Sequence, residues 1–374
     1  MEKLLIIDGN SIVNRAFYAL PLLTNQFGEF SNAVYGFSNI LTKSILEYKP
    51  KYIAVAFDFA KKTFRNDIYA EYKGKRKGMP EELAVQMPIL KELLNSMNIK
   101  YFEKNGIEAD DIIGTISKEE NVEKIILSGD RDLFQLIDDK TTVYFTKKGV
   151  SEIEAVDEKK LKELMGLTPS QIVEYKALRG DASDNIPGVS GIGDKTALSL
   201  LEEFGTVDNI YANIDKISKQ SVKEKLINGK EMAEISKRLA TIDRKVNLKY
   251  KLEDLKYTFP YNEKVYEFFK RYDFKSLMRR NEIFADNIQE QVKPNSTEYE
   301  TVKIESIEKL NEVIKYIKEE GRIAFDFTNG FKMACSPNFE YVFNEDISMF
   351  SSTLTLEDAI KQLAPIFQSK SILK

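Results

Sequence analysis

The sequence predicts an α/β protein with a mostly parallel central sheet and flanking helices. Three short apolar runs each end in an aspartate: Lys3 to Asp8, Tyr52 to Asp58, and Lys124 to Asp132. Continuous apolar runs of this length are typical of strands buried on both faces of a parallel sheet. Apolar residues with helical spacing lie between these runs, over 33–48, 81–97 and 110–118. Strands that alternate with helices indicate a parallel sheet.

The downstream segments extend this pattern. A further strand is expected over 100–106, and helices over 158–165, 169–178, 195–204 and 221–242 make the second half mostly helical. Segment 286–300 is polar, contains a proline and has no periodicity, so it is predicted to be a linker. A small second α/β pattern follows, with a strand near Val302, helices over 307–319 and 356–367, and strands over 322–327, 331–336 and 340–344.

The composition excludes several classes of protein. The chain has 374 residues, enough for about two domains. It contains no histidine, which excludes Ser-His-Asp triads, histidine-ligated zinc and an imidazole general base. Its single cysteine, Cys335, excludes an intrachain disulfide and favours a reducing cytoplasm. No apolar run is long enough for a signal peptide or a membrane span, so we expect a cytoplasmic protein with no membrane partner.

Nine carboxylates are expected to meet at one edge of the sheet. Parallel strands end at a common edge, where open α/β sheets bind their ligands. The set comprises strand-end acids, helix-start acids and two acids of the loop RGDASDNIPGV: Asp8, Asp58, Glu108, Asp110, Asp111, Asp130, Asp132, Asp181 and Asp184. Taken singly, each is better explained as an ordinary strand end or helix start, but their shared position favours a site.

These carboxylates point to divalent metal ions. Two like charges ~4 Å apart repel by roughly 4 kcal/mol at an effective dielectric of about 20. Either most of the acids are therefore protonated, with raised pKa values, or divalent cations neutralise them. Ligation by oxygen alone suits Mg²⁺ or Mn²⁺. Two such ions a few Å apart are typical of phosphodiester cleavage, in which metal-activated water needs no imidazole base.

A basic segment follows Asp58 directly. Residues 61–78, KKTFRNDIYAEYKGKRKG, contain the cations Lys61, Lys62, Arg65, Lys73, Lys75, Arg76 and Lys77, with Tyr69 and Tyr72 interleaved. Charges that pair with phosphates, beside rings that stack on bases, suit a single-stranded nucleic acid. A solvated lysine-rich loop is the alternative, and the position beside a ligand-edge aspartate favours binding. Neutralising the nine carboxylates would also change the formal net charge from −4 to +5.

A glycine-rich turn precedes one of the downstream helices. IPGVSGIGDKTA, Ile186 to Ala197, places Gly188, Gly191 and Gly193 before a helix that starts near Lys195. Glycine permits tight turns and close backbone approach, and a helix N-terminus offers free N–H groups to a phosphate. A hairpin of this kind suits binding of one duplex backbone without reading its sequence.

Together these motifs resemble the N-terminal 5′ nuclease domain of bacterial DNA polymerase I, a member of the flap endonuclease family. The resemblance covers about residues 1–284 and rests on LLIIDGNS, VAFD, KTFR, YKGKR, GIEADDII, SGDRDLFQL and RGDASDNIPGVSGIGDKTA. It implies an α/β core over 1–180 with a helical arch over about 60–82, and a helix–three-turn–helix DNA-binding half over 181–285. It also implies an Mg²⁺-dependent 5′–3′ exonuclease and flap endonuclease that acts in DNA replication and repair.

The resemblance also implies roles for individual residues. Asp8, Asp58, Glu108 and Asp110 would hold the first of two Mg²⁺ ions, for which Mn²⁺ can substitute. Asp130, Asp132, Asp181 and Asp184 would hold or surround the second ion, with Asp111 lending charge. Catalytic residues that steer the scissile phosphate would be Arg15, Lys62, Arg65, Tyr72, Lys73 and Arg76. Further DNA contacts would come from Lys61, Lys75, Lys77, Gly188, Gly191, Gly193, Lys195 and Thr196, and carbonyl groups of the hairpin would bind K⁺.

The implied substrate is DNA with a 5′ flap, nick or gap, including RNA-primed 5′ ends. We expect a nucleoid-associated monomer that is followed by a polymerase domain in the full-length protein. Residues 301–374 resemble the start of the 3′–5′ exonuclease-like domain of these polymerases. Active versions have Asp-x-Glu after the first strand, but Phe327 and Thr328 follow Asp326 here, so this partial domain is expected to be inactive.

Two other functions are alternatives to the nuclease. The first is a non-catalytic module that binds branched DNA, against which the complete set of acids argues. The second is a phosphatase of the haloacid dehalogenase type with Asp8 as its nucleophile. That class needs another aspartate two positions later, where this chain has Asn10.

Overall fold

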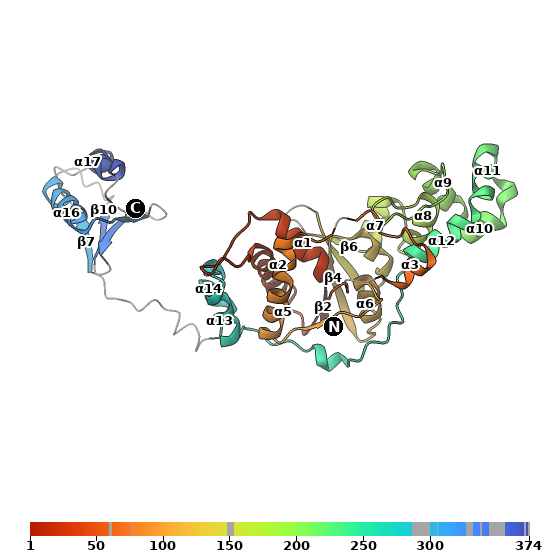
Figure 1. Ribbon diagram of the computed structural model, residues 1–374, viewed down its shortest axis with the longest axis horizontal. Coiled ribbons are helices and arrows are strands. Elements are labelled where there is room, and N and C mark those ends of the chain that lie inside the picture. Colours follow the sequence, from red (N-terminus) through yellow and green to blue (C-terminus); the bar gives the residue numbers. More distant parts are fainter. Residues whose placement is uncertain are drawn as a thin grey trace. The chain divides into compact units, whose positions relative to one another are not determined.

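The computed structural model describes residues 1–59, 62–76, 78–147, 153–285, 300–304, 306–326, 332–336, 339–343, 356–369 and 372. The chain forms two compact units, Met1–Ile288 and Gln289–Lys374 (Figure 1). The predicted linker falls almost wholly outside the described residues, as do Lys61, Lys77, Phe327 and Thr328. Among the described residues, no helix is long and apolar enough to span a membrane.

The first unit is built on a six-stranded sheet with the order β3-β2-β1-β4-β5-β6. Its strands are β1 (Glu2–Asp8), β2 (Tyr52–Ala56), β3 (Lys100–Phe102), β4 (Val122–Ser128), β5 (Thr141–Thr146) and β6 (Ile153–Val156). The first five strands pair in parallel, and β6 pairs antiparallel with β5. The predicted parallel sheet is therefore confirmed, and β1 and β4 lie side by side at its centre.

The helices of the first unit follow the sheet strands and then form the helical half. They are α1 (Gly9–Ala19), α2 (Asn32–Tyr48), α3 (Phe64–Ile68), α4 (Glu81–Ala84), α5 (Gln86–Ser96), α6 (Ala109–Ile116), α7 (Glu158–Met165), α8 (Gln171–Arg179), α9 (Asp194–Phe204), α10 (Val207–Ala212), α11 (Gln220–Asn228), α12 (Lys230–Ala240), α13 (Glu263–Arg271) and α14 (Lys275–Met278). Short 3₁₀ turns are η1 (Arg131–Leu136), η2 (Ile214–Lys216), η3 (Leu252–Leu255) and η4 (Asn281–Ile283).

The sheet is covered on both faces, which explains why its strands are apolar throughout. Figure 1 shows α1, α2 and α5 on one face and α6 on the other. Leu4 and Ile6 of β1 share a buried cluster with Ile112 and Ile116 of α6. Alternate residues of a strand point to opposite faces, so Leu5, which is also fully buried, faces the α1 side.

Two predicted helices are wrong in their continuity. The helix expected over 81–97 is divided into α4 and α5, because Pro88 has no N–H to bond to the carbonyl of Ala84. The helix expected over 221–242 is divided into α11 and α12 by Gly229. A Cβ at Gly229 would lie 2.7 Å from Cγ1 of Val189, so the chain turns where the hairpin packs closely against it.

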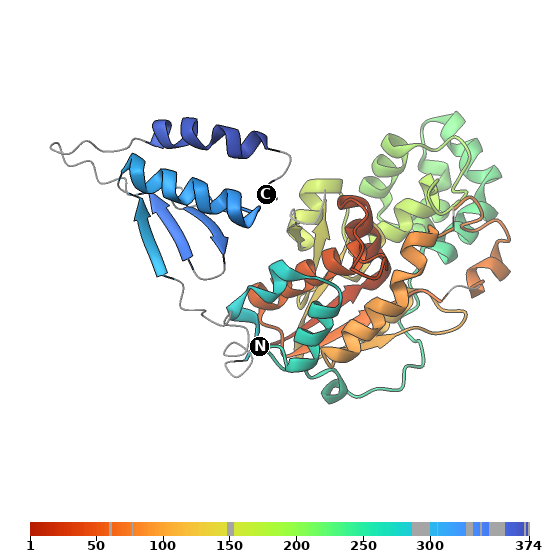
Figure 2. The same ribbon diagram turned by 60° about the vertical axis from the view of Figure 1, so that its left-hand side comes forward.

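The second unit has a four-stranded sheet with the order β7-β10-β9-β8. Its strands are β7 (Glu300–Ile304), β8 (Ala324–Asp326), β9 (Lys332–Ser336) and β10 (Phe339–Phe343), and its helices are α16 (Ile307–Glu320) and α17 (Leu356–Gln368). These elements lie close to the predicted ranges. Figure 2 shows the two helices side by side. The core of the unit includes Leu310, Met333 and Leu363, and Cys335 is buried there as a free thiol.

Candidate active site

Strand ends and one helix start bring the predicted carboxylates to one edge of the first sheet. Asp8 is the last residue of β1, and Asp58 and Asp130 each follow the end of a strand by two residues. The helix α6 begins at the same edge with Glu108 as its N-cap. In the sheet, β2 lies on one side of β1 and β4 on the other. The strand order therefore reverses between β1 and β4, and open sheets bind ligands at such a switch point.

Four of the nine acids line one cavity, and we call them the inner cluster: Asp8, Asp58, Asp110 and Asp130. The cavity has a volume of about 410 Å³ and is also lined by Lys73 and Arg76. Backbone groups and hydroxyls hold two of these carboxylates in place. Asp8 accepts hydrogen bonds from the Ser128 hydroxyl at 2.6 Å and from the Ser11 N–H at 3.0 Å. Asp58 accepts one from the Ala109 N–H at 2.8 Å.

Crowding of the inner cluster changes its protonation. Burial, together with the charges of Asp130 and Asp58, raises the pKa of Asp8 to about 7. Burial and the charges of Asp130 and Asp8 raise the pKa of Asp110 well above its ordinary value. From the sequence we expect either protons or divalent cations to relieve the repulsion among these acids. The raised pKa values favour protons at Asp8 and Asp110.

Asp132 and Asp181 form a second group, which we call the outer pair. The Lys176 ammonium contacts both carboxylates and lies 2.5 Å from Oδ2 of Asp181. The pair lines a cavity of about 450 Å³ that shares Gly129 and Asp130 with the first one. Burial raises the pKa of Asp132 to about 6, against the opposing effect of Lys176. Burial would also raise the pKa of Asp181, but Lys176 and Ser183 hold it below its usual range.

Glu108 and Asp184 are paired with the basic segment. Lys73 donates to Glu108 at 2.7 Å and Arg76 forms an ion pair with Asp184. The Tyr72 hydroxyl lies 3.2 Å from Glu108 and 3.4 Å from Asp184. The Tyr72 ring packs in an apolar cluster with Leu239 and Ala240 of α12, among others. The described part of the predicted arch is therefore packed against the helical half and not free of it.

Asp111 and Arg65 line neither cavity, and the Arg65 guanidinium lies 3.6 Å from Oε2 of Glu108. Asp111 is fully buried, and the Arg65 guanidinium donates to its two oxygens at 2.8 and 2.7 Å. Arg65 is 2% exposed and also donates to the carbonyl groups of Leu239 and Thr241. This buried pair joins α3 to α6 and to the end of α12. Arg65 therefore anchors these elements to one another, and its contact with the scissile phosphate stays a prediction.

The remaining predicted residues lie in three places. The Arg15 guanidinium donates to the Lys147 carbonyl at 2.9 Å, and one of its nitrogens lies 2.7 Å from where a Cβ of Gly129 would be. Lys62 and Lys75 are exposed, whereas the structure does not describe Lys61 and Lys77. At the start of α9, Gly191, Gly193 and Lys195 are exposed and Thr196 is half-buried.

Two details of the glycine hairpin differ from the expectation. Gly188 is buried at φ +64°, and its N–H donates to the Ser236 hydroxyl, so it shapes the hairpin. A Cβ there would lie 2.3 Å from the Gly180 nitrogen. The Gly191 carbonyl, one of those expected to bind K⁺, accepts a hydrogen bond from the Lys225 ammonium at 3.1 Å.

Sequence reasoning missed Lys176 and Ser128. Lys176 lies inside the helix-forming run QIVEYKALR, where a lysine is ordinary, and only its spacing of one turn and a half before Asp181 hints at the contact. Ser128 ends β4, and nothing in the sequence indicates its hydrogen bond to Asp8.

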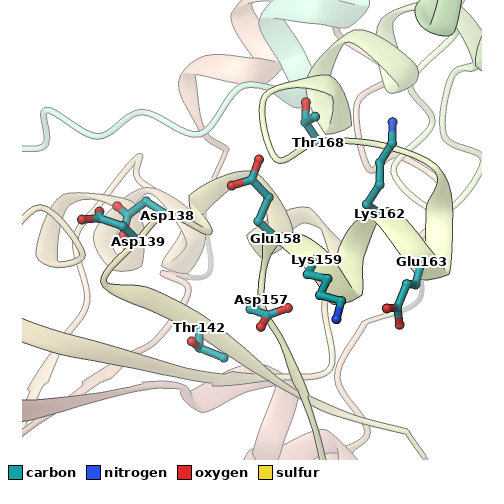
Figure 3. Close-up of a pocket in the computed structure, with 9 residues that line it drawn as sticks. All are labelled: Asp138, Asp139, Thr142, Asp157, Glu158, Lys159, Lys162, Glu163 and Thr168. Atoms are coloured by element: carbon teal, nitrogen blue, oxygen red, sulfur yellow. The ribbon is translucent and has the colours of Figure 1, made fainter.

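The site is a cavity lined by carboxylates and not a closed cage. Among the described residues, no three acidic or cysteine side chains converge closely enough to hold a metal ion as they stand. A larger cavity, of about 1040 Å³, lies near the start of β5, away from the edge where the carboxylates gather (Figure 3). Its acids, which include Asp138, Asp157 and Glu163, are interspersed with Lys159 and Lys162. None of the predicted site residues lines this larger cavity.

Solved structures define the class of this fold. Zinc-bound T5 5′-exonuclease is similar with a TM-score of 0.54 and 24% identity, over 65% of this chain and 90% of that one. A bacteriophage T5 flap endonuclease in a pseudo-enzyme-product complex with DNA and metal ions is similar with a TM-score of 0.53 and 25% identity, over 65% and 89% of the two chains. The fold is that of the 5′ nucleases.

Family models and curated relatives identify the family. Residues 3–166 match the 5′-3′ exonuclease N-terminal resolvase-like domain, and residues 167–263 match the 5′-3′ exonuclease C-terminal SAM fold. The chain belongs to the 5′-3′ exonuclease family. It is 48% identical to DNA polymerase I of Bacillus caldotenax over 284 residues, 75% of this chain and 32% of that protein. The corresponding protein of Bacillus subtilis is 46% identical over 282 residues, again 75% and 32%.

One further relative matches beyond the first unit. DNA polymerase I of Lactococcus lactis subsp. lactis is 37% identical over 361 residues, 91% of this chain and 41% of that protein. The chain thus spans about a third of the length of the first two relatives and somewhat more of this one.

Proposed function

We propose that the chain is a divalent-metal-dependent, structure-specific 5′ nuclease that hydrolyses phosphodiester bonds at 5′ flaps, nicks and gaps in DNA. The observation that carries the proposal is the inner cluster, whose four carboxylates line one cavity together with Lys73 and Arg76. Acids and cations at one cavity suit a substrate that brings its own negative charge to a metal site. The T5 structures, one with zinc and one with DNA and metal ions, support both parts of the proposal.

The donor set fits hard divalent cations. Every candidate ligand is a carboxylate oxygen, which suits Mg²⁺ or Mn²⁺, and two carboxyl groups of the inner cluster have raised pKa values. We assign the first ion to Asp8, Asp58, Glu108 and Asp110, and the second to Asp130, Asp132, Asp181 and Asp184. When bound, such a pair of ions supplies an activated water molecule and stabilises the leaving oxygen.

The protein's own residues hold and orient the reacting groups. Ser128 and the Ser11 N–H fix both oxygens of Asp8, so its carboxylate keeps one orientation whether or not it carries a proton. Lys73 and Arg76 lie at the same cavity, where their charges would bind the oxygens of the scissile phosphate. These cations pair with Glu108 and Asp184, so binding of a phosphate would exchange one set of ion pairs for another.

The helical half would bind duplex DNA. The exposed residues Gly193 and Lys195 lie at the start of α9, where free N–H groups favour a phosphate, and exposed Gly191 lies two residues before the N-cap. Because the Gly191 carbonyl already accepts from Lys225, binding of K⁺ there would require this lysine to move. The first two relatives are DNA polymerases of which the matched region is 32%, so we propose that the nuclease acts as a monomeric part of a longer protein in replication and repair.

One observation favours the alternative of a non-catalytic module that binds branched DNA. Lysine and arginine side chains already pair with Glu108, Asp132, Asp181 and Asp184, so that no closed metal site exists among the described residues. The inner cluster, however, has no ion pair within 4 Å among the described residues, and a pure binding module has no use for such a cluster.

A cleavage assay separates the two functions. A duplex with a 5′ flap, labelled at the flap end, is incubated with Mg²⁺ or with EDTA. The proposal predicts that Mg²⁺ releases a product of flap length and that EDTA abolishes it, with Asp110→Asn inactive but still able to bind DNA. Tight binding without cleavage in either Mg²⁺ or Mn²⁺ would instead establish the binding module.

A further inference from the structure

Lys176 lies between two acids that would hold the second metal ion. Its ammonium group contacts Oδ1 of Asp132 and lies 2.5 Å from Oδ2 of Asp181, and its side chain is 13% exposed. The lysine projects from α8, whereas Asp132 belongs to η1 and Asp181 to the loop after α8. The ion pairs therefore hold together two carboxylates from separate parts of the chain.

The surroundings of the outer pair differ from those of the inner cluster. Among the described residues, no lysine or arginine lies within 4 Å of an inner-cluster carboxylate, whereas Lys176 bridges both members of the outer pair. The two cavities meet at Gly129 and Asp130. The site therefore holds two groups of acids: the inner cluster, whose carboxylates have no ion pair within the described part of the chain although Lys73 and Arg76 line the same cavity, and the outer pair, which a lysine already bridges.

We propose that Lys176 is a positioning residue: it holds Asp132 and Asp181 together as their resident counter-cation, and a second divalent ion has to displace it. The inference rests on the proposed metal-dependent function. A divalent cation bound by both carboxylates would occupy the place of the ammonium group, and the two positive charges repel when they are close. The four inner-cluster carboxylates have no such bridging lysine among the described residues, so an ion bound there should be held more tightly than the second ion.

The test is a Mn²⁺ titration in which electron paramagnetic resonance counts the free ion. Wild type is expected to bind one ion tightly and a second weakly. Lys176→Met removes the charge and keeps the length of the side chain, so it should strengthen binding of the second ion by about tenfold or more. Lys176→Arg keeps the charge and should leave the second ion weak. An unchanged or weakened second ion in Lys176→Met would overturn the proposal.

A matched control exists elsewhere in the chain. Lys237 bridges Glu174 and Asp208 at 2.9 Å each, outside both cavities. Lys237→Met also removes a lysine that bridges two carboxylates, and it should leave the affinities for both Mn²⁺ ions unchanged. If it strengthens Mn²⁺ binding as much as Lys176→Met does, the effect is one of net charge and the proposal fails.

A second measurement uses the wild-type protein and does not depend on a variant that folds. Lysine acetylation followed by mass spectrometry should show faster modification of Lys176 when Mg²⁺ is saturating, because the displaced ammonium becomes accessible, with no change at Lys237. Equal modification of Lys176 with and without Mg²⁺ would overturn the displacement. If wild type cleaves flaps with Mg²⁺ but shows no such change, only this inference fails, whereas absence of both cleavage and metal binding would remove the proposed function as well.

Discussion

Two neighbouring acids, Asp110 and Asp111, have different surroundings, so replacing one should affect activity and replacing the other should affect stability. Asp110 lies in a cavity with other carboxylates, and burial together with the charges of Asp130 and Asp8 raises its pKa. Asp111 is fully buried and accepts two hydrogen bonds from Arg65 at 2.8 and 2.7 Å. We therefore expect Asp110→Asn to remove activity without loss of stability, and Asp111→Asn to remove stability.

The magnitudes follow from what each replacement leaves behind. Asp111→Asn leaves the Arg65 guanidinium, 2% exposed, without its ionic partner, and breaking one side of a buried pair costs about 3–5 kcal/mol. For a unit of this size that lowers Tm by roughly 6–20 °C. Asp110→Asn removes a carboxyl group whose pKa burial raises, because burial disfavours its ionised form, so the free energy of unfolding in EDTA should stay the same or rise.

The assay measures stability and activity on the same preparations. Denaturant unfolding in EDTA gives the free energies, and flap cleavage at a temperature where Asp111→Asn is still folded gives the activities. Asp111→Asn should cleave while folded, and Asp110→Asn should not. The reasoning would be refuted if Asp111→Asn were as stable as wild type, or if Asp110→Asn lost more than about 2 kcal/mol.

Three further predictions concern pH, binding and orientation. The folded pKa of Asp8 is about 7 against an ordinary value of 3.8, so the folded metal-free protein keeps a proton that the unfolded chain releases. Its free energy of unfolding in EDTA should therefore fall as pH rises from about 4 to about 7, and in saturating Mg²⁺ it should be nearly independent of pH. A free energy of unfolding that rises with pH in EDTA would contradict this. Replacing both Lys73 and Arg76 with Ala should weaken DNA binding and reduce the slope of its salt dependence by about two, while Lys100→Ala, which alters a lysine outside the cavity, should leave the slope unchanged. Ser128→Ala removes the 2.6 Å hydrogen bond to ionised Asp8 and should shift the pH profile of cleavage upward; a profile that stays in place would argue against this role.

The sequence predicts the parts of the fold that have one strong local cause. Fully apolar runs such as Leu4 to Ile7 identify buried parallel strands, and the aspartate after each run then locates the ligand edge. The strand β5, TTVYFT, was not expected because threonines stand at both of its ends, which leaves no continuous apolar run, and three of its side chains remain half-buried. The helix breaks at Val85 and Gly229 were also missed, since a helical pattern of apolar residues continues across both.

The composition of the site could be predicted, but its division into groups could not. Which acids meet follows from strand order, whereas the partner of each acid depends on contacts between residues far apart in the chain. Arg65 lies 46 residues before Asp111, and nothing near either one indicates that they pair. The sequence also predicts that these nine carboxylates need protons or cations. In the structure the pKa of Asp8 is raised, which favours its protonated form, and lysine or arginine side chains form ion pairs with several of the other acids.

The central claim is that the inner cluster binds a divalent cation, and anomalous diffraction from crystals grown with Mn²⁺ tests it most directly. The account predicts an anomalous peak in the cavity lined by Asp8, Asp58, Asp110 and Asp130, and loss of that peak in crystals of Asp110→Asn. An inner cluster without a peak at a Mn²⁺ concentration that supports flap cleavage would contradict the account.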